Sequence, residues 1–409
     1  MTVLRANHAP TTVLICASAI LAISLGVRHA FGLFLQPISL AENWNRETFA
    51  FAIALQNLVW GISQPFAGLL ADRFGAGKIV AAGSVLYALG LLTMSQPHGQ
   101  LVFIAGAGVL VGLGLSGTTY PLVLGAVSRS TSAERRSLAL GIAMAGAAFG
   151  QFLFLPASFA GIERLGWSPT LATLAFCAAV MLPLAIPLFE GKSNNDPVRA
   201  AAQDVTAVVA LRTALRHRGF QLLALGFFVC GFQVVFVATH VPAFLMDKGL
   251  SLRTGSVLLA LIGLLNIPGT YYAGLWGGRY SKTKLLALIY LSRGLIIAIF
   301  AFLPANELSG YAFGAAMGLF WLSTVPLTNG TVATLFGVRN MAMLSGIVFL
   351  AHQLGGFLGG WAGGLFFDWF KSYDVGWAAM IALSLLAALV NGQIKEPAAD
   401  TLKVAEPHA

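Results

Sequence analysis

Charged residues are scarce in this 409-residue chain, and acidic residues are the scarcer kind. Only 10% of its residues are Asp, Glu, Lys or Arg, whereas a soluble globular protein carries about 25%. Hydrophobic residues make up 57% of the chain, and its mean hydropathy is +0.81. This composition argues against an ordinary soluble domain and predicts a chain that is embedded in a membrane.

Cysteine is also rare, and each cysteine lies in an apolar run without polar ligands beside it. We therefore interpret Cys16, Cys177 and Cys230 as small packing residues. We expect them to form neither disulfides nor a metal site. The nearest approach to a phosphate loop, GAGK at 75–78, has no preceding strand and no following Ser or Thr. No nucleophile stands at a usable spacing from a base. We therefore expect no metal, no cofactor and no enzymatic activity.

Apolar segments recur along the whole chain. A membrane helix needs about 20 mostly apolar residues, and the sequence offers twelve such segments. They lie near residues 12–38, 48–70, 78–97, 101–127, 137–159, 168–189, 219–244, 255–277, 284–303, 309–332, 341–365 and 374–394. The sequence thus predicts an all-α integral membrane protein with twelve transmembrane helices.

The basic residues predict the orientation of these helices. With the amino terminus inside the cell, 17 of the 24 Lys and Arg residues fall on the cytoplasmic side, 5 outside and 2 within the membrane. Because cytoplasmic loops carry the excess of Lys and Arg, both termini are predicted to be cytoplasmic, in the cell inner membrane. The net charge of +9 is then a signal of topology. It does not indicate nucleic-acid binding, since the basic residues are scattered over several short loops.

The longest polar stretch divides the chain into two similar parts. Residues 191–218 are predicted to be a cytoplasmic linker between six-helix bundles at 1–190 and 219–409. The alternative for the second part of this stretch is an amphipathic helix on the inner membrane surface. A repeat supports the division, because GLLADRFGAGK at 68–78 and GLWGGRYSKTK at 274–284 share five positions. Repeated halves are common in transporters whose substrate site lies between them.

The first copy of this repeat resembles the G-x-L-A-D-R-x-G-[RK]-[RK] motif of the major facilitator superfamily. It departs from the motif at Ala76 and Gly77, which stand where the motif has two basic residues. The resemblance implies the twelve-helix fold of that superfamily over nearly the whole chain, and a gating role in which Asp72 meets a helix amino terminus or an arginine. A purely topological role for the charges stays open. The predicted gating residues are Gly68, Asp72, Arg73, Gly75 and Lys78.

Within that superfamily the chain is most similar to the monocarboxylate and oxalate/formate transporter group. The similarity lies in GVRHAFGLFLQPI at 26–38, ENWNRETFAFA at 42–52 and FLAHQLGGFLGGW in the eleventh segment. His352 stands where the oxalate/formate exchangers place a lysine. Members of the group commonly carry an arginine in helix 8, where this chain has Asn266. The resemblance therefore shifts the binding of the substrate to Arg28.

Two arginines lie within the apolar segments themselves, Arg28 in the first and Arg293 in the ninth. A charge at the centre of a membrane helix costs roughly 2.5 to 3.5 kcal/mol, so each should face protein or a watery cavity. A guanidinium can hold a carboxylate through two parallel hydrogen bonds. Because helix 1 lines the cavity of the resembling fold, Arg28 is the predicted substrate contact, with a structural bond to Gln56 or Asn57 as the alternative. Arg293 is predicted to cap backbone carbonyls between helices 8 and 9, with contact to the substrate as the alternative.

No Asp or Glu falls in the middle of a predicted segment, so no carboxylate is left there to carry protons. This disfavours exporters of drugs and cations. Histidine titrates near neutral pH, and His352 and His29 are the predicted proton-coupling residues, with simple packing as the alternative for both. His352 is also predicted to contact the substrate. The other side chains predicted to line the substrate site, each of which alternatively binds helices together, are Tyr120, Gln151, Gln233, Asn266, Tyr271, Trp321 and Asn329.

These observations predict a secondary transporter of small organic anions, above all monocarboxylates, that works by alternating access as a monomer. Its partners are the anion, the lipid membrane, and either protons or a counter-anion. Proton-coupled uptake and anion exchange both stay open. The alternatives are an exporter of a larger or neutral metabolite or drug, and a membrane sensor of the same fold that binds its ligand without transporting it.

Overall fold

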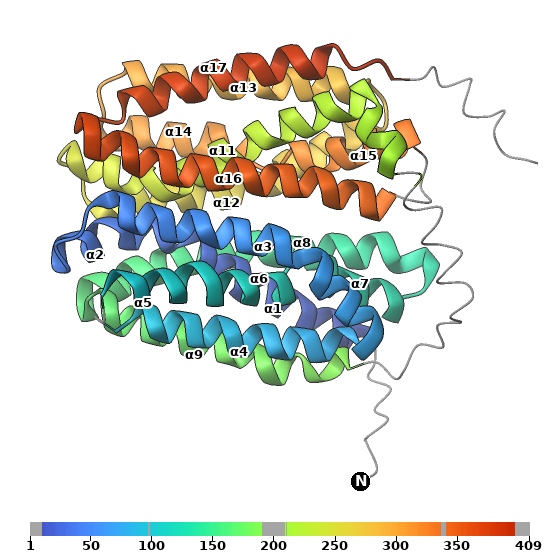
Figure 1. The fold of residues 1–409 in the computed structure, drawn as a ribbon, viewed down its shortest axis with the longest axis horizontal. Coiled ribbons are helices and arrows are strands. Elements are labelled where there is room, and N and C mark those ends of the chain that lie inside the picture. The colour runs from blue at the N-terminus through green and yellow to red at the C-terminus, as the bar shows by residue number, and fades with distance from the viewer. Residues whose placement is uncertain (1–9, 97–98, 190–208, 210, 337–340, 397–409) are drawn as a thin grey trace, which may run out of the picture.

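The computed structural model describes residues 10–96, 99–189, 209, 211–336 and 341–396. Within these ranges the chain forms helices joined by short turns, with no strand. The long helices run side by side along one axis, and both ends of the described chain lie at the same end of the bundle (Figure 1). We call this the Pro10 end, and the opposite end, where the third helix begins, the Arg46 end.

The helices follow the predicted segments in order. The first half contains α1 (Pro10–His29), η1 (Phe31–Phe34), α2 (Leu35–Ala41), α3 (Arg46–Phe74), α4 (Ala76–Met94), α5 (Gln100–Ile104), the π-helical stretch η2 (Ala105–Leu110), α6 (Val111–Thr118), α7 (Tyr120–Ser130), α8 (Ala133–Leu165), α9 (Trp167–Leu184) and η3 (Ile186–Leu188). The second half contains α11 (Arg218–Asp247), α12 (Leu252–Gly277), α13 (Lys282–Phe302), α14 (Glu307–Phe320), α15 (Thr324–Phe336), α16 (Met341–Phe370) and α17 (Asp374–Gly392).

Eleven helical segments of the described chain are long and apolar enough to cross a membrane. The one predicted segment missing from these eleven is the second, 48–70, which forms α3, a helix of 29 residues. Its hydropathy is lowered by three buried amides, Gln56, Asn57 and Gln64. These amides bond to protein groups, as Gln56 Nε2 does to the carbonyl oxygen of Ala107 at 2.8 Å. The prediction of an all-α chain with twelve long helical segments is confirmed for the described residues.

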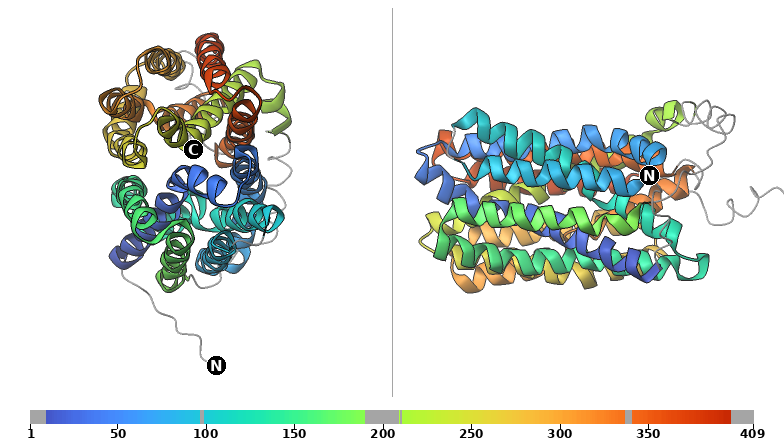
Figure 2. Two further views of the ribbon diagram at one scale, coloured as in Figure 1. Left: turned by 90° about the vertical axis from the view of Figure 1, so that its left-hand side faces the viewer. Right: turned by 90° about the horizontal axis from the view of Figure 1, so that it is seen from below.

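The two sets of helices lie as two groups when the bundle is seen from one end (Figure 2). One hydrogen bond recurs in both groups. Tyr87 of α4 donates to the carbonyl oxygen of Ser24 in α1 at 2.8 Å, and Tyr290 of α13 donates to that of Gly226 in α11 at 2.6 Å. This recurrence supports the interpretation of the chain as two repeated halves. Most of the predicted linker 191–218 lies outside the described residues, and its residues 211–216 are helical.

The fourth helix of each half is broken near its middle. Thr119 is extended between α6 and α7, with φ −109° and ψ −174°, and residues 321–323 interrupt the helix between α14 and α15. Both breaks fall inside segments that the sequence predicts as continuous helices, at 101–127 and 309–332. Interrupted helices at corresponding positions of two halves are typical of transporter binding sites, because they free backbone polar groups inside the membrane.

Helix α16 of the second half packs along α3 of the first half. Gly364 lies against Ala50, and Gly360 lies against Ala54. Farther along, a Cβ added to Gly61 of α3 would come within 2.7 Å of the Cβ of Gln353. Glycine at position 61 therefore allows the closest approach of the two helices at the level of Gln353.

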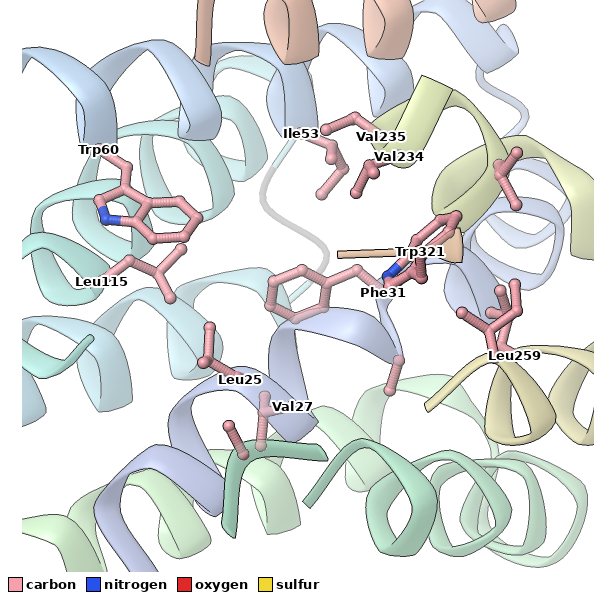
Figure 3. Close-up of a cluster of buried hydrophobic side chains, with 14 of the residues drawn as sticks. Leu25, Val27, Phe31, Ile53, Trp60, Leu115, Val234, Val235, Leu259 and Trp321 are labelled. Carbon is pink, nitrogen blue, oxygen red and sulfur yellow. The ribbon is translucent and has the colours of Figure 1, made fainter. Parts of the chain in front are cut away.

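Apolar side chains from both halves meet in the middle of the bundle (Figure 3). Phe31 of η1 lies among them and is almost fully buried. Val235 of α11 and Leu259 of α12 reach the same cluster from the second half, as does Trp321 at the break between α14 and α15. The contact between the halves is thus largely apolar here, so polar groups within it are few and must be paired with one another.

The last described residue, Glu396, ties the segment that follows α17 to the start of α13. Its Oε1 accepts hydrogen bonds from the backbone N–H of Thr283 at 2.7 Å and from the Ser281 hydroxyl at 2.9 Å. Partial burial raises the pKa of the Glu396 carboxyl. The hydrogen bonds from Thr283 and Ser281 and the charge of Lys282 outweigh this effect and lower the pKa below its ordinary value.

We expect Glu396→Gln to destabilise the protein at neutral pH and not at low pH. A carboxyl whose pKa is lowered by folding stabilises the folded state above its unfolded pKa of about 4.3, and the stabilisation is lost as the pH falls through the lowered value. The loss should be about 1 kcal/mol, the scale of a helix N-cap. Thermal unfolding of both proteins between about pH 7 and pH 3 measures it. A difference that stays constant over this range would show that the charge is not involved.

Candidate functional site

Arg28, near the end of α1, keeps part of its hydrogen-bonding capacity free. Its Nη2 donates to Oδ1 of Asn57 at 2.6 Å, and its guanidinium lies 5.0 Å from the centre of the Trp60 ring. Its Nε is buried and has no hydrogen-bond partner among the described residues. Of the two structural partners predicted for Arg28, Asn57 is bonded to it, and Gln56 instead donates to Ala107.

Tyr120 is brought toward Arg28 by the break in the fourth helix. It is the first residue of α7, directly after the extended Thr119, and it is half-buried. The phenols of Tyr120 and Tyr87 lie near the Arg28 guanidinium. The first half therefore presents a guanidinium, a phenol and an indole to the same region.

His352 lies in the second half, opposite this group. The ring is 7% exposed and stands between Phe227 and Phe349, with ring centres 4.8 and 5.9 Å away. Its Nδ1 lies 3.1 Å from Oε1 of Gln353. Phe349 also contacts Trp60 of α3 edge-on at 5.5 Å. Trp60 and Phe349 thus form an aromatic contact across the two halves, with Arg28 on one side and His352 on the other.

Arg293 is fully buried, and its donors are used by the protein itself. The guanidinium donates to the carbonyl oxygen of Phe320 from Nε at 3.0 Å and from Nη2 at 2.7 Å, and also to that of Trp321. Its Nη1 reaches Oε1 of Gln233 at 3.3 Å and Sγ of Cys230 at 3.4 Å. Arg293 does cap backbone carbonyls. These carbonyls belong to the break between α14 and α15, however. The sequence predicted carbonyls between the eighth and ninth segments, 255–277 and 284–303.

Three of the predicted amides bond to other helices. Gln233 Nε2 donates to the Ser384 hydroxyl at 2.5 Å, and Asn266 Oδ1 accepts from the backbone N–H of Leu322 at 3.0 Å. Asn266 therefore holds the break between α14 and α15, and Gln233 bonds to α17 in the core of the second half. Gln151 of α8 donates to the carbonyl oxygen of Leu259 in α12 at 3.2 Å, so it joins the two halves.

The remaining predicted residues have no common location. Trp321 is fully buried, and its Nε1 has no hydrogen-bond partner within the described ranges. Asn329 is half-buried. Tyr271 is 67% exposed and contacts only the ring of Tyr272 among the described aromatic pairs. His29 Nδ1 donates to the carbonyl oxygen of Leu25, one turn back in its own helix, at 2.6 Å.

The predicted gating motif forms the turn from α3 to α4. Gly75 joins the two helices with φ +93°, a conformation that favours glycine. The guanidinium of Arg73 lies 5.3 Å from the Phe74 ring centre, Lys78 is exposed, and Gly68 has open space around it. The side chain of Asp72 lies outside the described part of the structure, and its predicted contact stays a prediction.

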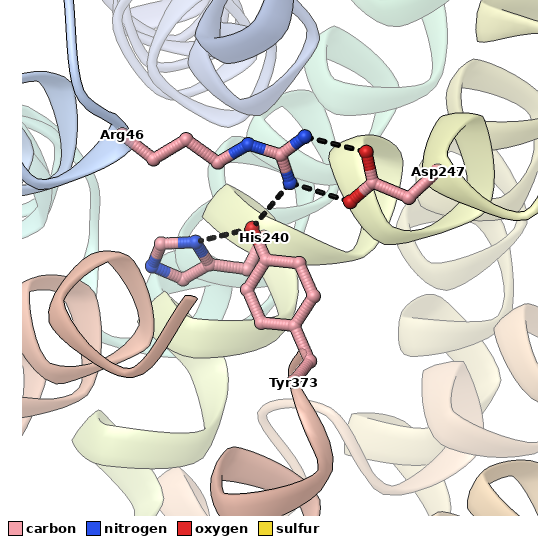
Figure 4. A network of polar contacts seen from close by, with 4 residues as sticks. All are labelled: Arg46, His240, Asp247 and Tyr373. Atoms are coloured by element: carbon pink, nitrogen blue, oxygen red, sulfur yellow. Dashed lines mark hydrogen bonds and ion pairs between the residues drawn. The ribbon is translucent and has the colours of Figure 1, made fainter. Parts of the chain in front are cut away.

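A polar network that the sequence analysis did not predict joins the halves at the Arg46 end (Figure 4). Arg46 of α3 donates two hydrogen bonds to Asp247 of α11, at 2.5 and 2.6 Å, and a third to the Tyr373 hydroxyl at 3.0 Å. Its guanidinium also lies 3.7 Å from the centre of the Phe367 ring. His240 completes the network with its Nδ1 3.4 Å from the Tyr373 hydroxyl.

A second pair of contacts lies beside this network. The backbone N–H of Glu47 donates to Asp368 of α16 at 2.8 Å, and the indole N–H of Trp361 donates to the Glu47 carboxylate at 3.0 Å. Toward the Pro10 end, by contrast, Gly141 of α8 and Gly346 of α16 have open space where a side chain would stand. The Arg46 end is therefore joined by polar contacts between α3, α11 and α16.

Comparison with known proteins identifies the family. The sequence profile of the Major Facilitator Superfamily matches residues 14–360. The chain belongs to this superfamily. It is 28% identical over 395 residues to the uncharacterized MFS-type transporter YcxA of Bacillus subtilis (strain 168), a match that covers 93% of each chain. It is 29% identical over 361 residues to monocarboxylate transporter 11 of Homo sapiens, covering 84% of this chain and 74% of that protein.

A solved structure shows the same fold. The crystal structure of a D-xylose-proton symporter matches with a TM-score of 0.69 at 14% identity, covering 94% of this chain and 97% of that one. These matches are all transporters of the major facilitator superfamily. The chain is therefore a multi-pass membrane transporter and not an enzyme.

The signal for the Arg46 network was present in the sequence of this major facilitator protein. Arg46 precedes the second apolar segment, and Asp247 follows the seventh, so both are predicted on the same side of the membrane. Opposite charges on one side of the membrane at the ends of helices from different halves are candidates for a gate. The sequence does not show which of several such charges meet.

Proposed function

We propose that this transporter moves small organic anions, above all monocarboxylates, by alternating access between two six-helix halves at 1–190 and 219–409, joined by the linker 191–218. The observation that carries the proposal is Arg28, a guanidinium within the membrane whose buried Nε has no partner. A carboxylate that accepts from Nε and a terminal nitrogen would satisfy it in a parallel, two-bond geometry. Within the described chain no carboxylate is bonded to Arg28.

The relatives support a carboxylate substrate. Besides the human protein, a rat protein that is 24% identical over 350 residues is named monocarboxylate transporter 13. We place Arg28, Tyr120 and His352 at the substrate, and we assign the proton to His352 when transport is coupled to protons. Exchange against a second anion is the other way to drive the same cycle. We propose that the monomer is the transporting unit.

The proposed orientation places the Pro10 end in the cytoplasm of a cell whose inner membrane holds the protein. Lys and Arg are concentrated in loops on that side, which is typical of cytoplasmic loops. A cysteine at Asn306, between α13 and α14 on the opposite side, should then react with an impermeant maleimide in intact cells. Reaction at Arg279 instead of Asn306 would reverse the orientation.

A flux assay in proteoliposomes tests the function. Purified protein should accumulate at least one of acetate, lactate and pyruvate when a pH gradient or an internal counter-anion is supplied, and it should not accumulate a neutral sugar. Flux of only neutral or cationic compounds would favour an exporter of metabolites or drugs. Binding without flux, seen as thermal stabilisation by an anion, would favour a sensor.

The Arg46 network is proposed to be the closed gate of the transport cycle, with the Arg46 end shut in this structure. Asp247→Asn is expected to favour opening of that end, because it leaves the buried charge of Arg46 without its partner. A shift of about 1.4 kcal/mol changes the open population tenfold. We therefore expect a cysteine at Val235, which is buried between the halves, to react about tenfold faster with a maleimide.

Asp374→Asn is the matched control for this gate. Asp374 is an exposed carboxylate at the same end and has no described bond to Arg46. The control should leave the reactivity of the cysteine at Val235 unchanged. Equal labelling in wild type and Asp247→Asn would show that the Arg46 network is not what holds this end shut.

A further inference from the structure

Arg28 and His352 are linked through Asn57 and Gln353 by hydrogen bonds that cross from one half to the other. Arg28 Nη2 donates to Oδ1 of Asn57 at 2.6 Å, and Gln353 Nε2 donates to the backbone carbonyl of the same Asn57 at 3.2 Å. Gln353 Oε1 then lies 3.1 Å from Nδ1 of His352. Asn57 and Gln353 are fully buried, so neither amide exchanges these bonds for water.

The direction of every bond in this chain follows from two backbone carbonyls, which can only accept. Asn57 Nδ2 donates to the carbonyl of Ile53 at 2.7 Å, so its Oδ1 must face Arg28. Gln353 donates from Nε2 to the carbonyl of Asn57, so its Oε1 must face His352. An amide oxygen is an acceptor, and Nδ1 of His352 therefore carries the hydrogen. The neutral ring then has its lone pair on Nε2.

We propose that Gln353 is a positioning residue that fixes this tautomer of His352, so that Nε2 is the atom that binds the transported proton, and that its bond to Asn57 makes proton binding depend on contact between the halves. The proposal rests on the proposed transport function. Because Gln353 belongs to α16 and Asn57 to α3, the bond between them must break when these helices separate. An imidazolium donates a stronger hydrogen bond to Oε1 than the neutral ring does. While the halves touch, Asn57 holds the Gln353 amide with its Oε1 toward His352. The proton is therefore held most firmly in that state.

The charges around His352 explain why an anion would accompany the proton. On α11 the Cys230 thiol lies close to the imidazole. On α13 Arg293 and Tyr290 lie beyond that thiol, and on α1 Arg28 is reached through Asn57. No carboxylate is bonded to any of these groups within the described ranges. A third positive charge at His352 is repelled by both arginines, and an anion bound at Arg28 reduces this repulsion.

The tautomer can be read directly, without any substrate. In protein with 15N-labelled histidine in detergent micelles, the His352 signals are those missing from the His352→Gln variant. At a pH where the ring is neutral we expect a protonated Nδ1 and an unprotonated Nε2. In Gln353→Leu the two tautomers should mix, because the acceptor is gone. A protonated Nε2 in the wild type would overturn the proposal, whatever the protein transports.

The pH dependence of flux gives the second measurement, with acetate, lactate or pyruvate as the probe, whichever gives the largest flux. We expect Gln353→Leu to move the midpoint of the pH profile to lower pH by about one unit, because the imidazolium loses a charge-assisted hydrogen bond. Gln353→Glu should move it to higher pH, because a carboxylate favours the imidazolium. A merely structural role of Gln353 would lower the rate in both variants without these opposite shifts.

Gln151→Leu is the matched control, since it also removes a buried glutamine that bonds a backbone carbonyl across the two halves. It should leave the midpoint unchanged, whatever it does to the rate. A midpoint that stays fixed in both Gln353 variants, or wild-type flux that is independent of pH between about 5.5 and 8, would overturn the proposal. Anion transport itself would be refuted separately, by wild-type protein that moves none of acetate, lactate and pyruvate.

Discussion

Arg28→Gln is expected to abolish anion flux while the protein stays folded. The substitution removes the positive charge and the two-donor edge that a carboxylate would bind, and charge-assisted hydrogen bonds of this kind are the strong ones. Losing them should lower flux at least about 100-fold. Arg28→Lys should keep some flux, since it keeps the charge. The flux should be only partial, because lysine cannot reproduce the parallel geometry. Uptake of labelled acetate, lactate or pyruvate into proteoliposomes measures both variants.

The folding of Arg28→Gln distinguishes a binding role from a structural one. Arg28 has one described hydrogen bond, to Asn57, and a glutamine can still reach an amide partner. Removing a positive charge from the membrane also removes its desolvation cost, so the empty variant should be at least as stable as the wild type. A folded Arg28→Gln protein that transports its anion at the wild-type rate would show that Arg28 is structural. The proposed function would then lose its main support.

In contrast to Arg28→Gln, Arg293→Met is expected to prevent accumulation of folded protein. It leaves the carbonyl oxygens of Phe320 and Trp321 and the amide oxygen of Gln233 without their buried donor. Each unsatisfied buried group costs about 1 to 3 kcal/mol, so the total loss should exceed about 3 kcal/mol. Size-exclusion chromatography of the detergent extract and thermal unfolding measure the loss.

Arg293→Lys is the companion variant, because it keeps the charge but has no planar fork for several carbonyls at once. We expect it to be less stable than the wild type and more stable than Arg293→Met. If Arg293→Met were as stable as the wild type and had lost anion flux, Arg293 would belong to the substrate site. In that case the break between α14 and α15 would be held by Asn266 and its bond to Leu322.

The sequence predicted most of the fold because membrane helices are local in their requirements. In lipid, each backbone polar group must be satisfied within its own helix, so every spanning helix needs a long apolar segment that composition alone reveals. The predicted segment that composition describes least well is α3, whose buried Gln56, Asn57 and Gln64 face neighbouring helices. The breaks at Thr119 and at 321–323 were not predicted either, because the partners that cap them lie on other helices.

The sequence indicated some residues of the candidate site and missed others, and the misses have a common cause. Arg28 and His352 stood out because a charge or an imidazole within an apolar segment is costly wherever the chain folds. Gln353 did not stand out, since residues next to each other on a helix point about 100° apart and seldom act together.

The sequence by itself therefore determined the membrane class, the number and order of the helices, and the polar groups that need partners inside the membrane. Only the tertiary structure decided which partners those groups have. Arg46 meets Asp247 across 201 positions of sequence, and Gln353 meets Asn57 across 296. The tertiary structure also separated two arginines that look alike in the sequence, because Arg293 lies against a broken helix whose carbonyls need donors, whereas Arg28 lies where the halves meet and part of its guanidinium stays unpaired.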